Sequence, residues 1–288
     1  MLSIGVYVFN VLSIGAIILL GITLLTALIS SSVSRSPVWY TYMISIFVLS
    51  ATNIMIVGQQ CGPQAPSRVA CIGQAILIYP TVVFPTYAAC ALLLQIYLTV
   101  VYYGTSRGLP KAIAKSLFVV PVVMTAIALG ISTISAALDP SRAVLDASGM
   151  RCHIDHKNPT TFISTVVICS FAATPILILE PLLIRKVLHG RRTLKNQDTA
   201  GYVTHSSGSM DMALRVCCFN ILFLFALVAL SMTFKLGDGG QGTINMAMAI
   251  LPMGGGMLFG LQKDIIGVWK SWTQRVVSRH PRPSPLEI

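Results

Sequence analysis

Hydrophobic residues along this chain gather in seven long continuous stretches, and charged residues return in the gaps between them. The stretches cover residues 4–29, 38–58, 69–103, 116–138, 161–184, 216–234 and 243–261. They contain no Lys or Arg, and Glu180 is their one carboxylate. A helix needs about 20 mainly apolar residues to cross ~30 Å of hydrocarbon. Because backbone polar groups in lipid must be satisfied internally, and these stretches are uniformly apolar rather than alternating, each one predicts a transmembrane helix.

After the last stretch, the pattern changes from uniformly apolar to amphipathic. Apolar residues interspersed with polar and basic ones recur at helical spacing, namely Ile265, Trp269, Trp272 and Val276. This spacing predicts an amphipathic helix over residues 263–279 that lies in the membrane interface, with its indole rings at headgroup depth. The alternative is a plain continuation of the seventh helix into water. The proline-rich residues 280–288 predict a disordered tail.

The composition limits the number of domains. The chain has 288 residues, of which 55% are hydrophobic, and a mean hydropathy of +0.77. Residues 1–262 are taken up by the bundle, which leaves no room for a second folded domain. The expected fold class is all-α: a polytopic seven-transmembrane helix bundle with a C-terminal amphipathic in-plane helix. The first stretch is longer than the signal-peptide core of about 7–15 residues, so we expect it to be the first span.

The net charge of +11 would suit a nucleic-acid-binding protein, but its distribution favours a membrane. With the N-terminus placed outside, the segments that face the cytoplasm hold most of the 20 Lys and Arg residues. The outer segments hold Arg68, Arg142, Arg151, Lys157 and Lys235. This bias is the positive-inside pattern, and the basic residues then face anionic inner-leaflet lipid. We therefore expect a plasma-membrane protein with a cytoplasmic C-terminus, whose partner is the lipid bilayer and not nucleic acid.

Three cysteines, Cys61, Cys71 and Cys152, fall at predicted outer positions, with Cys71 at the outer end of the third span. The oxidising exterior permits one disulfide among these three thiols. We favour a bond between Cys71 and Cys152, which would tie the top of the third helix to the second outer loop. A bond between Cys61 and Cys152 is the alternative, since spacing along the chain does not separate the two pairings.

Uncharged polar side chains are scattered through the outer half of the predicted bundle. They are Asn53, Gln59, Gln60, Gln74, Tyr79, Thr81, Tyr87 and Asn245. Each one alone is explained by hydrogen bonding between helices, worth roughly 0.6–2 kcal/mol. As a set they predict the lining of an uncharged pocket, which suits a small organic or lipidic ligand better than an ionic one.

Glu180 lies close to the predicted inner end of the fifth helix. A carboxylate inside a membrane helix is costly, which makes it a functional candidate. From this position Glu180 would reach the interface, or pair with Arg185 or with Arg215 at the base of the sixth helix. We expect such an ion pair rather than a proton or ion site. It would provide a two-state contact between the fifth and sixth helices.

Enzymatic and cofactor chemistry lack the residues that they need. All five histidines lie in loops or the tail, so no zinc site is expected inside the bundle. No Gly-x-Ser-x-Gly element occurs, and the seventh span has no Lys for a retinal Schiff base. The outer run Cys152-His153-x-Asp155-His156 has metal-binding residue types, but a solvated loop is the expected structure. We expect no enzymatic activity, no cofactor and no metal.

Seven spans, an outer N-terminus, a third-helix cysteine opposite a second-loop cysteine and an in-plane helix after the seventh span resemble the G-protein-coupled receptors. The rhodopsin-like signatures are absent: no Asp-Arg-Tyr ends the third span, and no Asn-Pro-x-x-Tyr occurs in the seventh. Several short motifs are similar to those of the uncharacterised seven-span receptor-like proteins of mushroom-forming fungi. They are Trp39-Tyr40, Gly58-Gln59-Gln60, Cys71-x-x-Gln74-Ala75, Tyr79-Pro80 and Phe259-Gly260-Leu261-Gln262-Lys263-Asp264.

The resemblance implies a receptor fold and, by analogy, coupling to a heterotrimeric G protein. We therefore expect an integral membrane receptor that transmits the binding of a small, mostly uncharged extracellular ligand to a cytoplasmic partner. That partner would contact the basic inner loops 107–115 and 185–195. The alternative is a small-solute transporter or channel, which needs a continuous polar path, whereas this sequence offers one carboxylate and scattered amides. A scaffold protein without a ligand is a third alternative.

Overall fold

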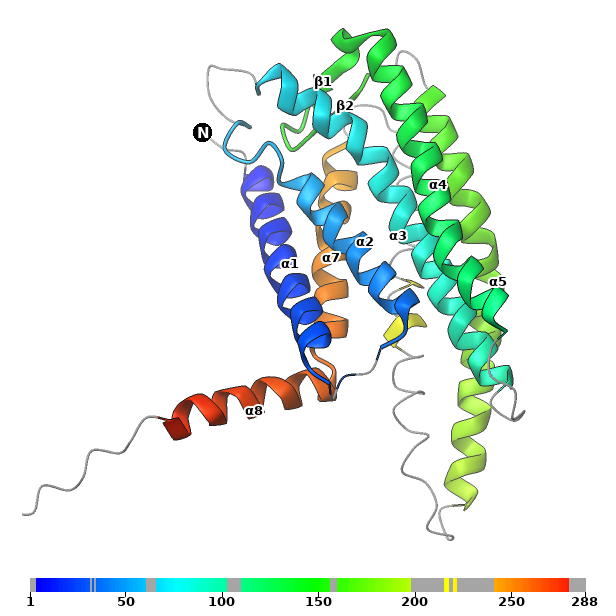
Figure 1. Cartoon of the computed structure of the whole chain (residues 1–288). Coiled ribbons are helices and arrows are strands. Elements are labelled where there is room, and N and C mark those ends of the chain that lie inside the picture. The colour runs from blue at the N-terminus through cyan, green and yellow to red at the C-terminus, as the bar shows by residue number, and fades with distance from the viewer. Residues whose placement is uncertain are drawn as a thin grey trace, which may run out of the picture.

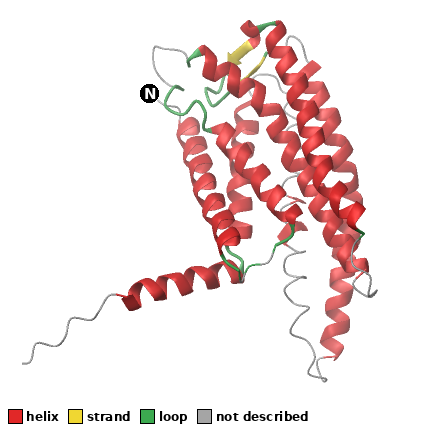
Figure 2. Cartoon of the chain, in the orientation of Figure 1, coloured by secondary structure: helices red, strands yellow, loops and turns green. Residues whose placement is uncertain are grey.

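The structure, a computed structural model, describes residues 4–31, 33, 35–60, 66–102, 110–155, 160–197, 215–217, 220–221 and 241–279. Its helices are α1 (Ile4–Ile29), α2 (Pro37–Asn53), α3 (Arg68–Tyr102), α4 (Lys111–Leu138), α5 (Thr160–Gln197), α7 (Gln241–Gly260) and α8 (Lys263–Arg279). Between α4 and α5 lie a short 3-10 helix, η1 (Pro140–Arg142), and two strands, β1 (Ala143–Leu145) and β2 (Cys152–Ile154). Figure 2 shows how largely helical the described chain is. Most of the sixth predicted span, residues 216–234, lies outside the described residues.

Five of the described helices, α1, α3, α4, α5 and α7, are long and apolar enough to cross a membrane. α2 has 17 residues and is followed by turns that run to Gln60. Large hydrophobic side chains remain exposed on α1, α4 and α5, such as Ile14, Val122 and Ile178. Apolar surface of this extent is unfavourable in water but is matched by lipid tails. The chain is therefore a multi-pass membrane protein.

Among the described helices, α3 has the most neighbours, since it packs against α2, α4 and α5 and also contacts both strands. α1 lies beside α7, and α2 contacts both of them (Figure 1). Glycine allows the close approach of α1 and α7. A Cβ atom on Gly260 would lie 2.9 Å from Oγ1 of Thr23, and one on Gly256 would lie 3.2 Å from Leu19. Small residues at such crossings let membrane helices pack almost backbone to backbone.

The start of α2 is determined by its local sequence. The hydroxyl of Ser36 accepts a hydrogen bond of 3.2 Å from the Trp39 backbone N–H, and Pro37 occupies the first turn. Both residue types are favoured at these positions. The helix then places Trp39 and Tyr42 inside the bundle, where their rings meet Phe259 of α7 edge-on, with centroids 6.5 and 5.6 Å apart. This geometry is favourable for aromatic pairs, so the cluster holds α2 against α7.

α8 leaves the bundle at a steep angle to α7 (Figure 1). Among its described side chains, Ile265 and Val268 are buried. Nε1 of Trp269 donates a hydrogen bond of 2.8 Å to Oγ1 of Thr26 in α1. Trp272, which was predicted to share the apolar face, is 39% exposed. The helix is amphipathic, and the first part of its apolar face packs on α1.

Three elements differ from the expectations of the sequence. α5 runs to Gln197, so residues 185–195 are helical rather than part of a loop. Leu, Lys and Arg are strong helix formers, and a helix continues as long as its residues favour it, even where hydrophobicity ends. α4 begins at Lys111, directly after Pro110, rather than at residue 116. The predicted outer loop 139–160 contains β1 and β2, which the apolar pattern did not indicate.

Candidate functional site

Strands β1 and β2 form a hairpin at one end of the bundle, opposite to the end from which α8 leaves (Figure 1). We refer to these two ends as the hairpin end and the α8 end. The strands pair antiparallel, with Val144 opposite His153. Next to them, the backbone N–H of Asp146 donates to the Arg151 carbonyl at 2.9 Å. Gly149 has a φ of 72°, which residues with a side chain rarely adopt, and it allows the chain to turn tightly here.

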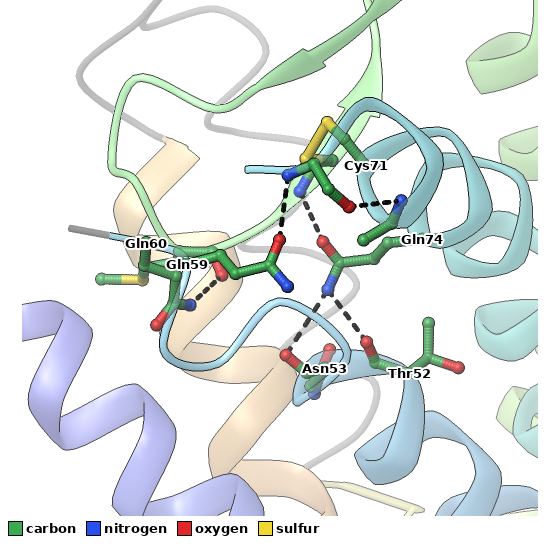
Figure 3. Close-up of a disulfide and its surroundings, with 10 residues drawn as sticks. Thr52, Asn53, Gln59, Gln60, Cys71 and Gln74 are labelled. Carbon is green, nitrogen blue, oxygen red and sulfur yellow. Dashed lines mark hydrogen bonds between the residues drawn. A yellow bond between two sulfur atoms is a disulfide. The ribbon is translucent and has the colours of Figure 1, made fainter. Parts of the chain in front are cut away.

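A disulfide and Gln74 tie the hairpin to α3 and α2. Cys152 of β2 is bonded to Cys71 of α3, the pairing that we favoured, while Cys61 lies outside the described residues. The backbone N–H of Cys152 donates to Oε1 of Gln74 at 2.7 Å. Nε2 of Gln74 donates in turn to the Thr52 carbonyl of α2, 2.9 Å away (Figure 3). One buried amide therefore joins β2, α3 and α2.

A second set of contacts joins the hairpin to α1 and α7. Nε2 of Gln60 donates to the Met150 carbonyl at 2.6 Å, and its Oε1 accepts a bond of 2.6 Å from Nδ2 of Asn10 in α1. On the side of α7, Nδ2 of Asn245 donates to the Asp146 carboxylate. The hairpin therefore contacts α3 and α7 directly, and Gln74 and Gln60 link it to α2 and α1.

The other predicted pocket residues also form hydrogen bonds with backbone groups. Four of them donate to carbonyls: Asn53 Nδ2 to Met248 at 3.2 Å, the Tyr79 hydroxyl to Ile154 at 3.4 Å, the Tyr87 hydroxyl to Ile168 at 3.0 Å and the Thr81 hydroxyl to Leu77 at 2.8 Å. Gln59 is an acceptor, since its Oε1 accepts a bond of 2.9 Å from the Ser67 N–H. Hydrogen bonding within the bundle thus explains much of this set. In the described part of the chain, Oδ1 of Asn53 and Oδ1 of Asn245 are buried without a partner. These two atoms remain available as acceptors.

Three residues of the hairpin end were missed by sequence reasoning: Asn10, Asp146 and Arg151. Asp146 is 5% exposed, and Nη1 of Arg151 is buried without a hydrogen-bond partner among the described residues. Burial lowers the pKa of the Arg151 guanidinium, and the nearby Asp146 and Tyr79 oppose that effect. Loop residues were not considered for the pocket, because their position over the bundle depends on the disulfide and the turn. One feature of the sequence indicated that Arg151 lies close to the bundle, namely that it directly precedes Cys152.

At the α8 end, the expected ion pair of Glu180 is not found among the described residues. Glu180 is 4% exposed, and its Oε1 atom has no hydrogen-bond partner. Arg185 is exposed on another face of α5, because successive helical residues are about 100° apart. Arg215 donates to the carbonyls of Leu258 and Leu261, at 2.9 and 3.5 Å. Carbonyls at the end of a helix lack intrahelical donors, so the end of α7 attracts this arginine.

Another arginine joins α8 to the start of α2. Arg35 donates to Oε1 of Gln262 and forms an ion pair with Asp264. Its guanidinium also lies over the ring of Trp39, 5.5 Å from the ring centre, in a cation–π contact. The α8 end is therefore held by contacts between the α1–α2 connection, the end of α7 and α8.

Comparisons with known proteins identify the fold. No family model matches this chain, and no curated protein matches its sequence. Among solved structures, it is similar to the crystal structure of squid rhodopsin, with a TM-score of 0.70 over 96% of this chain and 87% of the rhodopsin chain. The chain has the seven-transmembrane-helix fold of rhodopsin. Since the sequence identity is 11%, the likeness is one of fold.

Proposed function

We propose that this protein is an integral membrane receptor of the G-protein-coupled type. A small, mostly uncharged ligand would bind at the hairpin end and change how the α8 end meets a cytoplasmic partner. The observation that carries the proposal is that one hairpin, within a rhodopsin-like bundle, contacts α3 and α7 directly and is linked to α2 through Gln74 and to α1 through Gln60. A ligand shifts a conformational equilibrium only through contacts that differ between two states. A ligand that moves this hairpin changes contacts on four helices together.

The distribution of charge supports a cytoplasmic α8 end and an outside N-terminus. Basic residues lie at the start of α4, in the last part of α5 and along α8: Lys111, Lys115, Arg185, Lys186, Lys263 and Lys270. Fewer lie at the hairpin end, where Arg142 is paired with Asp139. The positive-inside rule then favours the cytoplasm for the α8 end. We further propose the plasma membrane, because a receptor for an extracellular ligand has to face the outside of the cell.

The partner that we propose is a heterotrimeric G protein, in contact with the basic segments 107–115 and 185–195. α5 supports this because it continues to Gln197 and extends past the neighbouring helices (Figure 1). A projecting basic helix offers a positively charged surface, which increases the association rate with an acidic partner. Residues 107–109 lie outside the described part of the chain.

As part of this proposal, we infer that the chain is related to the seven-span receptor-like proteins of mushroom-forming fungi. The residues of the shared motifs make contacts that hold the bundle together. Trp39 and Phe259 meet edge-on, Gln60 and Gln74 hold the hairpin, and the segment after Phe259 binds Arg35. This coincidence supports a common receptor architecture and does not identify a ligand.

The test is nucleotide exchange on G proteins reconstituted with the purified full-length protein, with and without an extract of small molecules. We expect extract-dependent exchange that falls when Arg191 and Arg192 of the α5 extension are both changed to Gln. Arg142→Gln, at the hairpin end, is the matched control and is expected to leave exchange unchanged. If a folded protein gives no exchange on any G protein, coupling is refuted. Solute uptake into sealed vesicles would then favour a transporter or channel.

A further inference from the structure

The hairpin end holds a guanidinium that its surroundings do not satisfy. Nη1 of Arg151 is buried and has no hydrogen-bond partner within the described residues. The ion pairs seen in that part of the chain, Arg35–Asp264 and Arg142–Asp139, do not include Arg151. Burying a charged donor without an acceptor is costly. A protein that keeps such a group gains from a ligand that supplies the missing acceptors.

Asp146 is the carboxylate whose charge acts on Arg151, but its oxygens are engaged elsewhere. Oδ1 accepts a bond of 3.2 Å from the Ser148 backbone N–H. Oδ2 accepts bonds from the Ser148 hydroxyl, at 2.8 Å, and from Nδ2 of Asn245. Because these bonds hold the turn, Asp146 favours the charged form of Arg151 from a distance without occupying its donors.

Arg151 lies at the edge of the hairpin end, and its surroundings restrict what a ligand would be. The residue as a whole is partly exposed although its Nη1 atom is buried, so a ligand has to approach this donor from the exposed side of the residue. Tyr79, whose hydroxyl interacts electrostatically with Arg151, belongs to an apolar cluster with Ile78 and Ile154. Such surroundings favour a ligand with one charged group and an apolar remainder.

We propose that Arg151 binds the carboxylate of a small organic acid that is otherwise uncharged. Guanidinium is a planar fork of donors that matches the two oxygens of a carboxylate, and two parallel charge-assisted bonds form where water is partly excluded. The inference rests on the proposed function in that this acid is taken to be the receptor's ligand. Binding of the acid itself is measured without any G protein, so the two proposals fail separately.

The experiment compares acids with their neutral amides on the full-length protein in lipid nanodiscs. The probes are benzoate against benzamide and hexanoate against hexanamide, and the readout is the midpoint of thermal unfolding. A ligand that binds the folded state raises this midpoint with its concentration. We expect at least one acid to raise the midpoint more than its amide does. Arg151→Gln abolishes the difference, whereas Arg142→Gln, in the same loop, preserves it.

A second variant separates ligand binding from a purely structural role. Arg151→Met removes the buried charge, so without a ligand its unfolding midpoint is expected to equal or exceed that of the wild type, and its response to the acids is lost. The proposal is overturned if neither acid exceeds its amide on the wild type, or if Arg151→Gln still distinguishes acid from amide. It is also overturned if Arg151→Met unfolds at a lower temperature than the wild type without a ligand, since the arginine then stabilises the hairpin itself.

Discussion

Gln74→Leu tests whether a single buried amide holds the hairpin on the bundle. Gln74 is 0% exposed, accepts from the Cys152 N–H at 2.7 Å and donates to the Thr52 carbonyl at 2.9 Å. Leu has a similar size but has neither group. The substitution therefore removes these two hydrogen bonds, and with them a longer one of 3.5 Å from Nε2 to the Asn53 carbonyl, while leaving the space filled.

The two bonds do not contribute equally. Without Gln74 the Cys152 N–H is left buried with no acceptor, which costs about 1–3 kcal/mol. The Thr52 carbonyl keeps a bond of 3.3 Å from the Met55 N–H, so losing its second donor costs about 0.5–1.5 kcal/mol. The total is about 1.5–4.5 kcal/mol. For a chain of this size the unfolding midpoint should fall by roughly 3–18 °C.

The assay is thermal unfolding in nanodiscs, followed by tryptophan fluorescence. Gln59→Leu is the matched control, because Gln59 makes one exposed bond, to the Ser67 N–H, and its loss should cost less than about 0.5 kcal/mol. In a background with Cys71 and Cys152 both changed to Ser, Gln74→Leu is expected to cost less, since both features restrain the same hairpin. An unchanged midpoint for Gln74→Leu, with the disulfide intact, would refute this reasoning.

Three further perturbations have defined outcomes. Reduction of the disulfide, which joins residues 81 positions apart, should lower the unfolding free energy by about 2–4 kcal/mol in denaturant titrations, and equal curves with and without reductant would contradict this. Gly260→Ala brings a Cβ to 2.9 Å from Oγ1 of Thr23 and should cost about 1–3 kcal/mol. Gly130→Ala meets nothing within 4 Å and should be neutral or stabilising, so equal unfolding midpoints for the two variants would argue against tight packing of α1 on α7. A hydrogen bond from Ser141 holds the pKa of Asp139 below its ordinary value of about 4, so this contact stabilises the fold above that pH and is lost as the pH falls through the lowered pKa. An NMR titration that finds an ordinary pKa for Asp139 would exclude that contribution.

The bundle could be predicted from the sequence because a bilayer requires long apolar helices, and seven such stretches leave little freedom of topology. The amphipathic α8 was likewise visible in its spacing, and of the predicted apolar face Ile265 is buried whereas Trp272 is 39% exposed. The disulfide between Cys71 and Cys152 was the favoured one of two pairings. Only outer cysteines meet an oxidising environment, and this limited the candidates to Cys61, Cys71 and Cys152.

The contacts of Glu180, the hairpin and the burial of Arg151 could not be predicted, because each depends on residues distant along the chain. Glu180 was expected to pair with Arg185 or Arg215, but Arg185 lies on another face of α5 and Arg215 donates to carbonyls at the end of α7. The hairpin was missed because its strands have three residues each, too few for a hydrophobic alternation to be seen. Arg151 was missed for a related reason, since its burial depends on how that hairpin lies on α3.

The contacts of Arg35 make α8 a reporter of the α8 end of the bundle. This side chain touches Trp39 at the start of α2, Gln262 directly after α7 and Asp264 in the first turn of α8. One side chain thus connects three segments. While these contacts hold, a shift of α7 along its axis changes the direction of α8. A fluorescent probe near the end of α8 would work like the tip of a lever, turning a small displacement beside Arg35 into a larger and measurable swing.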